Sequence, residues 1–267
     1  MLSDITIGQY LPGESFIHKL DPRTKIIISM LFVISLFIVN NFMGYVLVVG
    51  LLVLVIWVAK IPPRMVVKGL KPVFILILLT AILNLFMNKP VDENPLFQLG
   101  FIKIYYTSLI TAIFMSLRLV LLIVGTSILT YTTSPIQLTD GIEILLRPIG
   151  KNLAHELAMM MTIALRFIPT LIEETDKIMK AQKARGANFE TGNSIDRAKN
   201  LVPILVPLFV SSFRRADELA VAMEARCYRG GEGRNRMKKL AFTQKDIVAF
   251  MIFSIIFGGT IFLRILI

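Results

Sequence analysis

Long apolar runs, separated by short polar segments, dominate the first half of the chain. Residues 26–59 form 34 positions without a charge. As one helix this run would extend about 51 Å, well beyond the ~30 Å hydrocarbon core of a bilayer. Asn40, Asn41 and Gly44 indicate a tight turn inside it. The apolar pattern therefore predicts membrane spans near 24–40, 43–59, 72–87 and 107–130, with a last span near 246–266.

The stretch 132–245 follows a different, amphipathic pattern. Ser134 and Pro135 predict a helix start. Apolar residues then recur every three or four positions, and we expect an interruption at Pro169. The apolar segment 201–213 has only 13 residues and contains two prolines, so it is short for a span. We interpret it as packed against the membrane base or lying in the interface.

Composition and charge place these elements in a membrane. The chain is 55% hydrophobic and 18% charged, with a mean hydropathy of +0.71, which is too apolar for an ordinary soluble domain. Its net charge of +11 could suggest nucleic acid, but the basic residues lie beside apolar spans. Of the 29 Lys and Arg residues, 18 fall within 132–245. The positive-inside rule therefore places that region, the N-terminus and the loop 60–71 in the cytoplasm.

These observations predict an all-α integral membrane protein in three parts. The first is an N-terminal membrane part, residues 1–131, with four spans. The second is a cytoplasmic region of amphipathic helices, residues 132–245, and the third is a C-terminal transmembrane helix, residues 246–267. The loop between the third and fourth spans combines a polar turn at 88–95 with an aromatic stretch at 97–106, which we expect to be interfacial or re-entrant.

Two copies of one helical phrase, 41 residues apart, occur in the cytoplasmic region. The sequence DKIMKAQKARG at 176–186 aligns with DELAVAMEARC at 217–227. Residues three and four apart on a helix share one face. That shared face consists of Ile178, Ala181 and Arg185 in the first copy, and of Leu219, Ala222 and Arg226 in the second.

The chemistry of this phrase suits docking. Each copy ends with an arginine in its last turn, where a cation favours the negative helix terminus. Small alanines let a helix lie deep in a groove, and arginine offers a fork for a carboxylate. Gly186 predicts a left-handed stop after the first copy. Two copies suggest two equivalent sockets; the alternative is a pair of ordinary surface helices that share A-x-x-A-R.

The sequence contains little that indicates catalysis. It has no phosphate-binding loop, nucleophile elbow or cysteine ligand pair, so we expect no catalytic, cofactor-binding or metal site. His155 and Glu156 are interpreted as a surface or interface pair. The run Met159–Met161 indicates core packing, with an adaptable docking surface as the alternative.

Arg118 is the one charge deep in a span, and an intramembrane charge is by default a functional hypothesis. The other spans contain no acidic residue within their apolar runs. The sequence therefore favours a structural role, in which the guanidinium bonds to backbone carbonyls.

The chain resembles the transmembrane T component of energy-coupling factor transporters, the vitamin and metal importers related to ABC systems. The resemblance covers nearly the whole chain. It rests on HKLDPRTK at 18–25, LRFIP at 165–169 and the paired AQKARG and AMEARC. It implies a scaffold in a prokaryotic plasma membrane that joins two ABC ATPases to a substrate-binding S component, without binding nucleic acid.

In that family each Ala-Arg-small motif ends a coupling helix that docks into a groove on one ATPase. The resemblance thus implies that two Ala-Arg motifs dock on the ATPases, and that the other residues of the shared face support this docking. The residues concerned are Ala184, Arg185 and Gly186; Ala225, Arg226 and Cys227; and the supporting Ile178, Ala181, Leu219 and Ala222. Cys227 stands where the family often has glycine or alanine. We expect it to alter how the second helix terminates without abolishing docking.

The sequence therefore predicts a non-catalytic coupling subunit for uptake of a vitamin or transition metal ion, with ATP hydrolysed by partner subunits. The alternative is a self-contained secondary carrier, which would need polar or acidic residues in its spans or an inverted repeat of broken helices. An intramembrane enzyme would need a catalytic pair in the spans. Counting 201–213 as a sixth span would place Arg185 and Arg226 on opposite sides of the membrane, which the matched copies argue against.

Overall fold

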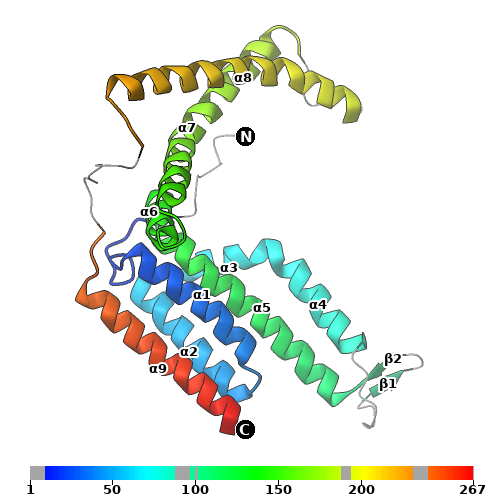
Figure 1. The fold of residues 1–267 in the computed structure, drawn as a ribbon. Coiled ribbons are helices and arrows are strands. Elements are labelled where there is room, and N and C mark those ends of the chain that lie inside the picture. Colours follow the sequence, from blue (N-terminus) through cyan, green and yellow to red (C-terminus); the bar gives the residue numbers. More distant parts are fainter. Residues whose placement is uncertain (1–9, 88–96, 100–101, 188–193, 231–239, 267) are drawn as a thin grey trace. The chain divides into compact units, whose positions relative to one another are not determined.

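The computed structural model describes residues 10–87, 97–99, 102–187, 194–230 and 240–266, and these form mainly helices (Figure 1). The chain divides into two compact units. We call Gln9–Gly141 with Lys239–Ile267 the bundle unit, and Ile142–Lys238 with Met1–Gly8 the arm unit.

The bundle unit contains the most apolar helices and one short antiparallel hairpin. Its elements are α1 (Pro22–Ile38), α2 (Phe42–Ala59), α3 (Pro63–Leu70), a 3₁₀ turn (Lys71–Val73), α4 (Phe74–Met87), β1 (Phe97–Leu99), β2 (Ile102–Ile104), α5 (Tyr106–Thr132) and α9 (Gln244–Leu266). Helix α6 (Pro135–Leu146) begins in this unit. Helix α1 starts as predicted, because Asp21 accepts the Arg23 N–H at 2.9 Å and Pro22 occupies the first position.

The core of the bundle unit lies between α1, α2, α5 and α9. Its buried side chains include Phe32, Leu36, Tyr45, Val48, Leu52, Leu121, Val124, Ile128 and Phe253. Helices α1 and α5 approach closely at Gly125, where the Phe32 ring leaves no room for a Cβ. Helix α4, by contrast, has no buried residue, and Ile75 is 77% exposed. An apolar helix with such exposure suits a lipid environment.

Within the described residues, five helical segments are long and apolar enough to cross a membrane. They are Phe42–Ala59, Pro63–Met87, Tyr106–Thr132, Lys151–Ala184 and Gln244–Ile265. The chain is thus an all-α integral membrane protein, as predicted, but the set of helices differs from the expected spans. Helix α1 has 17 residues and falls just short. Lys151–Ala184 qualifies with a mean hydropathy of 1.3, against 2.2 or more for the others.

Two elements of the bundle unit differ from the sequence analysis. The loop expected at 60–71 is largely helical, because Pro62 and Pro63 preset the start of α3 and Met65 packs against the core. The stretch expected to be interfacial or re-entrant contains the β1–β2 hairpin. The polar turn expected at 88–95 lies outside the described residues.

Arg118 of α5 lies at the turn between α1 and α2. Its Nη2 donates to the Val39 carbonyl at 2.8 Å and to Asn40 Oδ1 at 3.1 Å. Its Nε donates to Tyr45 Oη at 3.1 Å, and its guanidinium lies 5.9 Å from the centre of the Phe37 ring. A carbonyl at a helix end lacks a helical partner, and Arg118 supplies one for α1. The structural interpretation of this intramembrane charge is confirmed.

The arm unit consists mainly of α7 (Lys151–Ala184) and α8 (Ser194–Ala225), which cross in Figure 1. Residues later in α7 contact residues earlier in α8. Gln182 Nε2 donates to the Pro203 carbonyl at 3.4 Å, and Arg215 pairs with Glu174. The helices therefore run in opposite directions.

Prolines lie inside both helices of the arm unit. The interruption expected at Pro169 is wrong, since α7 continues through it, and α8 likewise contains Pro203 and Pro207. The segment 201–213 is therefore part of one 32-residue helix rather than a separate piece.

Candidate functional site

The first Ala-Arg motif lies at the C-terminal end of α7. The Gly186 N–H donates to the Lys183 carbonyl and the Ala187 N–H to the Gln182 carbonyl, both at 3.0 Å. These two bonds define a Schellman motif, with Arg185 as the last half-helical residue. Gly186 has a φ of +88°, so the predicted left-handed stop is confirmed.

The second Ala-Arg motif ends α8 in the same way. The Cys227 N–H donates to the Glu224 carbonyl at 2.8 Å, and the Tyr228 N–H donates to the Met223 carbonyl at 3.0 Å. Cys227 takes a φ of 54°, a conformation in which a side chain costs ~1–2 kcal/mol. The expectation that Cys227 changes the helix end is therefore wrong: the two Schellman bonds hold it in the geometry that glycine adopts in the first motif.

Both motifs present their residues to the surface. All six residues of the two motifs are exposed, as are the supporting Ala181 and Ala222, whereas Ile178 and Leu219 are partly buried. Arg185 and Arg226 occupy the same place relative to their helix ends. Since the last carbonyls of a helix carry partial negative charge, each guanidinium lies in a favourable field and stays available to a partner.

The surroundings of the two motifs differ. Leu219, Ala222 and Arg226 help to line a hollow of about 700 Å³ between α7 and α8, whereas the matching face of the first copy does not line it. The repeat in the sequence thus gives equal helix ends but unequal neighbourhoods.

Two segments named from the sequence contribute to this hollow, since Arg166 of LRFIP and Met159 of the methionine run both line it. Nothing in the sequence indicates Thr162 and Ile163, which also line it. Met160 is 58% exposed, so core packing is not its environment. The helical spacing of Met159, Ile163 and Arg166 would have placed them on one face, but no sequence signal shows that this face meets α8.

Glu156 is exposed and His155 is partly buried at a contact with neighbouring elements, which fits their interpretation as a surface or interface pair. His155 Nδ1 lies 3.5 Å from Glu143 Oε1 on α6, and its Nε2 lies 3.3 Å from Tyr228 Oη. Tyr228 directly follows the second Ala-Arg motif. His155 therefore links the residue after this motif to the start of α7 and to α6, within the arm unit.

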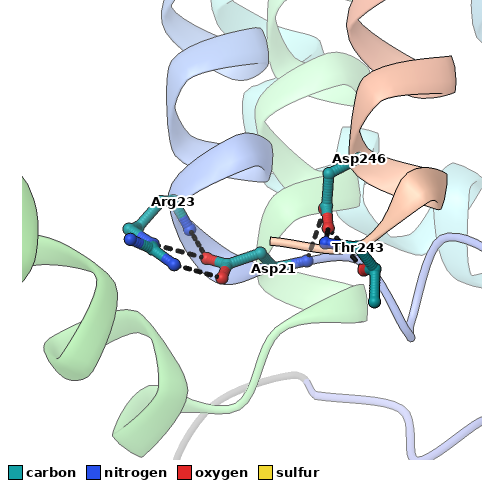
Figure 2. A network of polar contacts seen from close by, with 4 residues as sticks. All are labelled: Asp21, Arg23, Thr243 and Asp246. Carbon is teal, nitrogen blue, oxygen red and sulfur yellow. Dashed lines mark hydrogen bonds and ion pairs between the residues drawn. The ribbon is translucent and has the colours of Figure 1, made fainter. Parts of the chain in front are cut away.

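The HKLDPRTK lead has a structural role in the bundle unit (Figure 2). Asp21 accepts two bonds from the Arg23 guanidinium, at 3.0 and 2.7 Å. The Asp21 N–H donates to Asp246 Oδ1 at 2.8 Å, which ties α1 to α9. Lys25 Nζ donates to the carbonyls of His18 and Thr132. The lead thus joins the ends of three helices.

His18 takes part in this junction through both of its ring nitrogens. Its ring lies within hydrogen-bond distance of Ser15 Oγ at 2.7 Å and of the Leu11 carbonyl at 3.0 Å. Burial lowers the pKa of His18, and the nearby Lys25 charge acts in the same direction.

Replacing Cys227 with glycine is expected to tighten the end of α8. Glycine adopts a positive φ without the steric cost that Cys227 bears, so the helix end gains about 1 kcal/mol. Hydrogen exchange at the backbone amides of residue 227 and Tyr228 should slow about fivefold. Gly186→Cys is the matched control, because Gly186 has open space around its Cα, and it should speed exchange at the first motif. Unchanged exchange in both variants would contradict a strained cysteine.

Among the described residues, no group of three or more His, Cys, Asp or Glu side chains is arranged to hold a metal ion. The site therefore consists of two exposed helix ends and the hollow beside the second.

Comparison with known proteins shows what this chain is similar to. The family model CbiQ, described as cobalt transport protein, matches residues 13–238. A Clostridium kluyveri protein named energy-coupling factor transporter transmembrane protein EcfT is 64% identical over 93% of this chain and 93% of its own length. Proteins of the same name from Thermosediminibacter oceani and Bacillus subtilis are 55% and 49% identical, over 98% and 99% of this chain and 99% and 100% of theirs.

Proposed function

We propose a function for this chain, which belongs to the CbiQ and EcfT family of energy-coupling factor transporter membrane proteins. It couples two cytoplasmic ATPases to a substrate-binding S component. The ATPases hydrolyse ATP, and this chain is the non-catalytic link. The S component selects the substrate, a vitamin or a transition metal ion.

The observation that carries this proposal is the identical termination of α7 and α8. Each helix ends in a Schellman motif with an exposed arginine at the same position. Two helix ends of the same geometry suit two similar binding sites, one on each ATPase. A guanidinium that meets a carboxylate in such a socket forms charge-assisted, often bidentate, hydrogen bonds that are about twice as strong as neutral ones.

The lengths of the two helices suit transmission of movement. Helices α7 and α8 have 34 and 32 residues and extend about 51 and 48 Å. They are tied by the Arg215–Glu174 pair. Closure of the ATPases would displace Arg185 and Arg226 relative to each other, and the crossed helices would carry that displacement toward the S component. In this arrangement the N-terminus and residues 132–245 are cytoplasmic.

The test is a mild-detergent pull-down of the tagged chain from its native membrane, with co-purifying proteins identified by mass. Two ABC ATPases and at least one small membrane protein are expected. Several different small membrane proteins would identify a coupler that is shared among S components. Recovery of the chain alone, in detergents that preserve other ABC complexes, would contradict the proposal and favour a self-contained carrier.

A further inference from the structure

The hollow between α7 and α8, here called the arm groove, is built from one face of each helix. Its lining residues recur at helical spacing. They are Met159, Thr162, Ile163, Arg166 and Phe167 of α7; Arg215, Glu218, Leu219, Ala222 and Met223 of α8; and Arg226 and Tyr228, which follow α8. At about 700 Å³, the groove has the size of a binding cleft.

The arm groove is lined by both apolar and charged side chains. Seven of its twelve lining side chains are aliphatic, aromatic or thioether groups, and the flexible Met159 and Met223 can adapt to an irregular partner surface. Arg215 is engaged by Glu174. Arg166 and Arg226 are exposed and have no ion pair with another described residue. The groove therefore combines an apolar floor with two guanidiniums that are available to anions.

The occupant that fits these features is a segment with an apolar face flanked by carboxylates. Apolar residues would cover the methionines and Ile163, while carboxylates would meet Arg166 and Arg226. Glu218 is the one acidic residue that lines the groove, and it would repel such a segment.

We propose that the arm groove receives an acidic amphipathic segment of the ATPase subunit that docks at the second Ala-Arg motif. This inference rests on the proposed function. Arg226 belongs both to that motif and to the groove, so a protein seated on the motif also lies at the groove. The face of the first copy does not line the arm groove. The groove would therefore enlarge the contact of the ATPase at the second motif.

Site-specific photo-crosslinking in the full complex identifies the occupant. A benzoylphenylalanine replaces Thr162, which is exposed, lines the groove and lies outside both motifs. The matched control carries the same group at Ala164, which is exposed on α7 but does not line the groove. Position 162 should crosslink to an acidic stretch of an ATPase, and position 164 should not. A crosslink from 162 to a small membrane protein, to lipid or to a second copy of the chain would overturn the proposal.

Charge variants test the chemistry of the same contact. Arg166→Glu should weaken ATPase retention roughly tenfold in a chain that keeps both motifs. Glu218→Gln should strengthen retention severalfold, a gain that misfolding cannot produce. Lys177→Glu, on an exposed part of α7 that does not line the groove, is the control for net charge and should have little effect.

These outcomes separate the groove from the proposed function. Unchanged retention in Arg166→Glu, or weaker retention in Glu218→Gln, would overturn the groove proposal. If reversing Arg185 and Arg226 still released the ATPases, the proposed function would stand without it.

Discussion

Reversing both motif arginines, Arg185→Glu with Arg226→Glu, is expected to release the ATPases from the chain. Both arginines are exposed at Schellman-terminated helix ends, where the substitution would turn an attractive contact into a repulsive one. Removing one partner of a desolvated charge pair costs ~2–5 kcal/mol. Two such losses weaken binding by about a thousandfold or more. Co-purification of the ATPases from membranes, by mass and by immunoblot, measures the effect.

Membrane insertion should be unaffected by this double change, because both positions lie in the arm unit and outside the packed bundle core. The matched control is Lys180→Glu with Arg214→Glu. It makes the same change in net charge at exposed positions of the same two helices and should retain the ATPases. If the Arg185 and Arg226 variant co-purified with them as well as the unaltered chain, the motifs would not be the docking elements.

The single reversals should differ from each other. Arg226→Glu alters both the second motif and the arm groove, whereas Arg185→Glu alters only a helix end. We therefore expect the larger loss from Arg226→Glu. Either single variant keeps one intact Ala-Arg motif, so part of the ATPase should still co-purify. This comparison measures how unequal the two contacts are.

Local rules predicted the helix ends well. The N-cap of α1 follows from Asp21 and Pro22, and the stop of α7 follows from Gly186, because capping depends on residues within one turn. The stop at Cys227 was harder to foresee. Its side chain disfavours the left-handed conformation, so the residue type alone does not predict a stop. The repeat of the 176–186 sequence at 217–227 predicts the geometry better, because the first copy ends in this conformation.

Local rules failed where helical continuity is decided by more than one residue. Pro169, Pro203 and Pro207 lie within continuous helices. A proline removes one backbone donor and crowds the preceding turn. In a helix longer than 30 residues, the remaining backbone hydrogen bonds can offset this local destabilisation. In α3, the charges between 60 and 71 suggested a loop, although Met65 and Val66 form a face that packs on the core.

Contacts between distant segments could not be read from the sequence. The bond between Asp21 and Asp246 joins residues 225 apart, and the arm groove brings Arg166 to Arg226 across two helices. A T-x-x-D pattern at 243–246 could have predicted the start of α9, but not its partner. Helical spacing gives the faces of α7 and α8, while tertiary folding determines which faces meet.

Asp246→Ala is expected to destabilise the bundle unit strongly. Asp246 is 0% exposed. Its Oδ1 accepts the Asp21 N–H at 2.8 Å, and its Oδ2 accepts the Thr243 N–H at 2.8 Å and the Thr243 hydroxyl at 2.6 Å (Figure 2). Alanine would leave the Asp21 N–H without its acceptor in a buried place and remove the side-chain cap of α9. Together these losses cost about 2–4 kcal/mol.

The unfolding midpoint of the purified chain in detergent measures this loss, and a fall of roughly 5–15 °C is expected. Asp246→Asn keeps one oxygen acceptor and should fall between the alanine variant and the unaltered chain. Glu14→Ala is the control, because its carboxylate side chain is 93% exposed and its 3.7 Å pair with Lys19 lies at the surface; such pairs contribute little. A midpoint for Asp246→Ala equal to that of Glu14→Ala would mean that α1 and α9 are held together by their apolar contacts alone. The expected ordering instead places the link between the HKLDPRTK lead and α9 among the contacts that the bundle needs in order to fold.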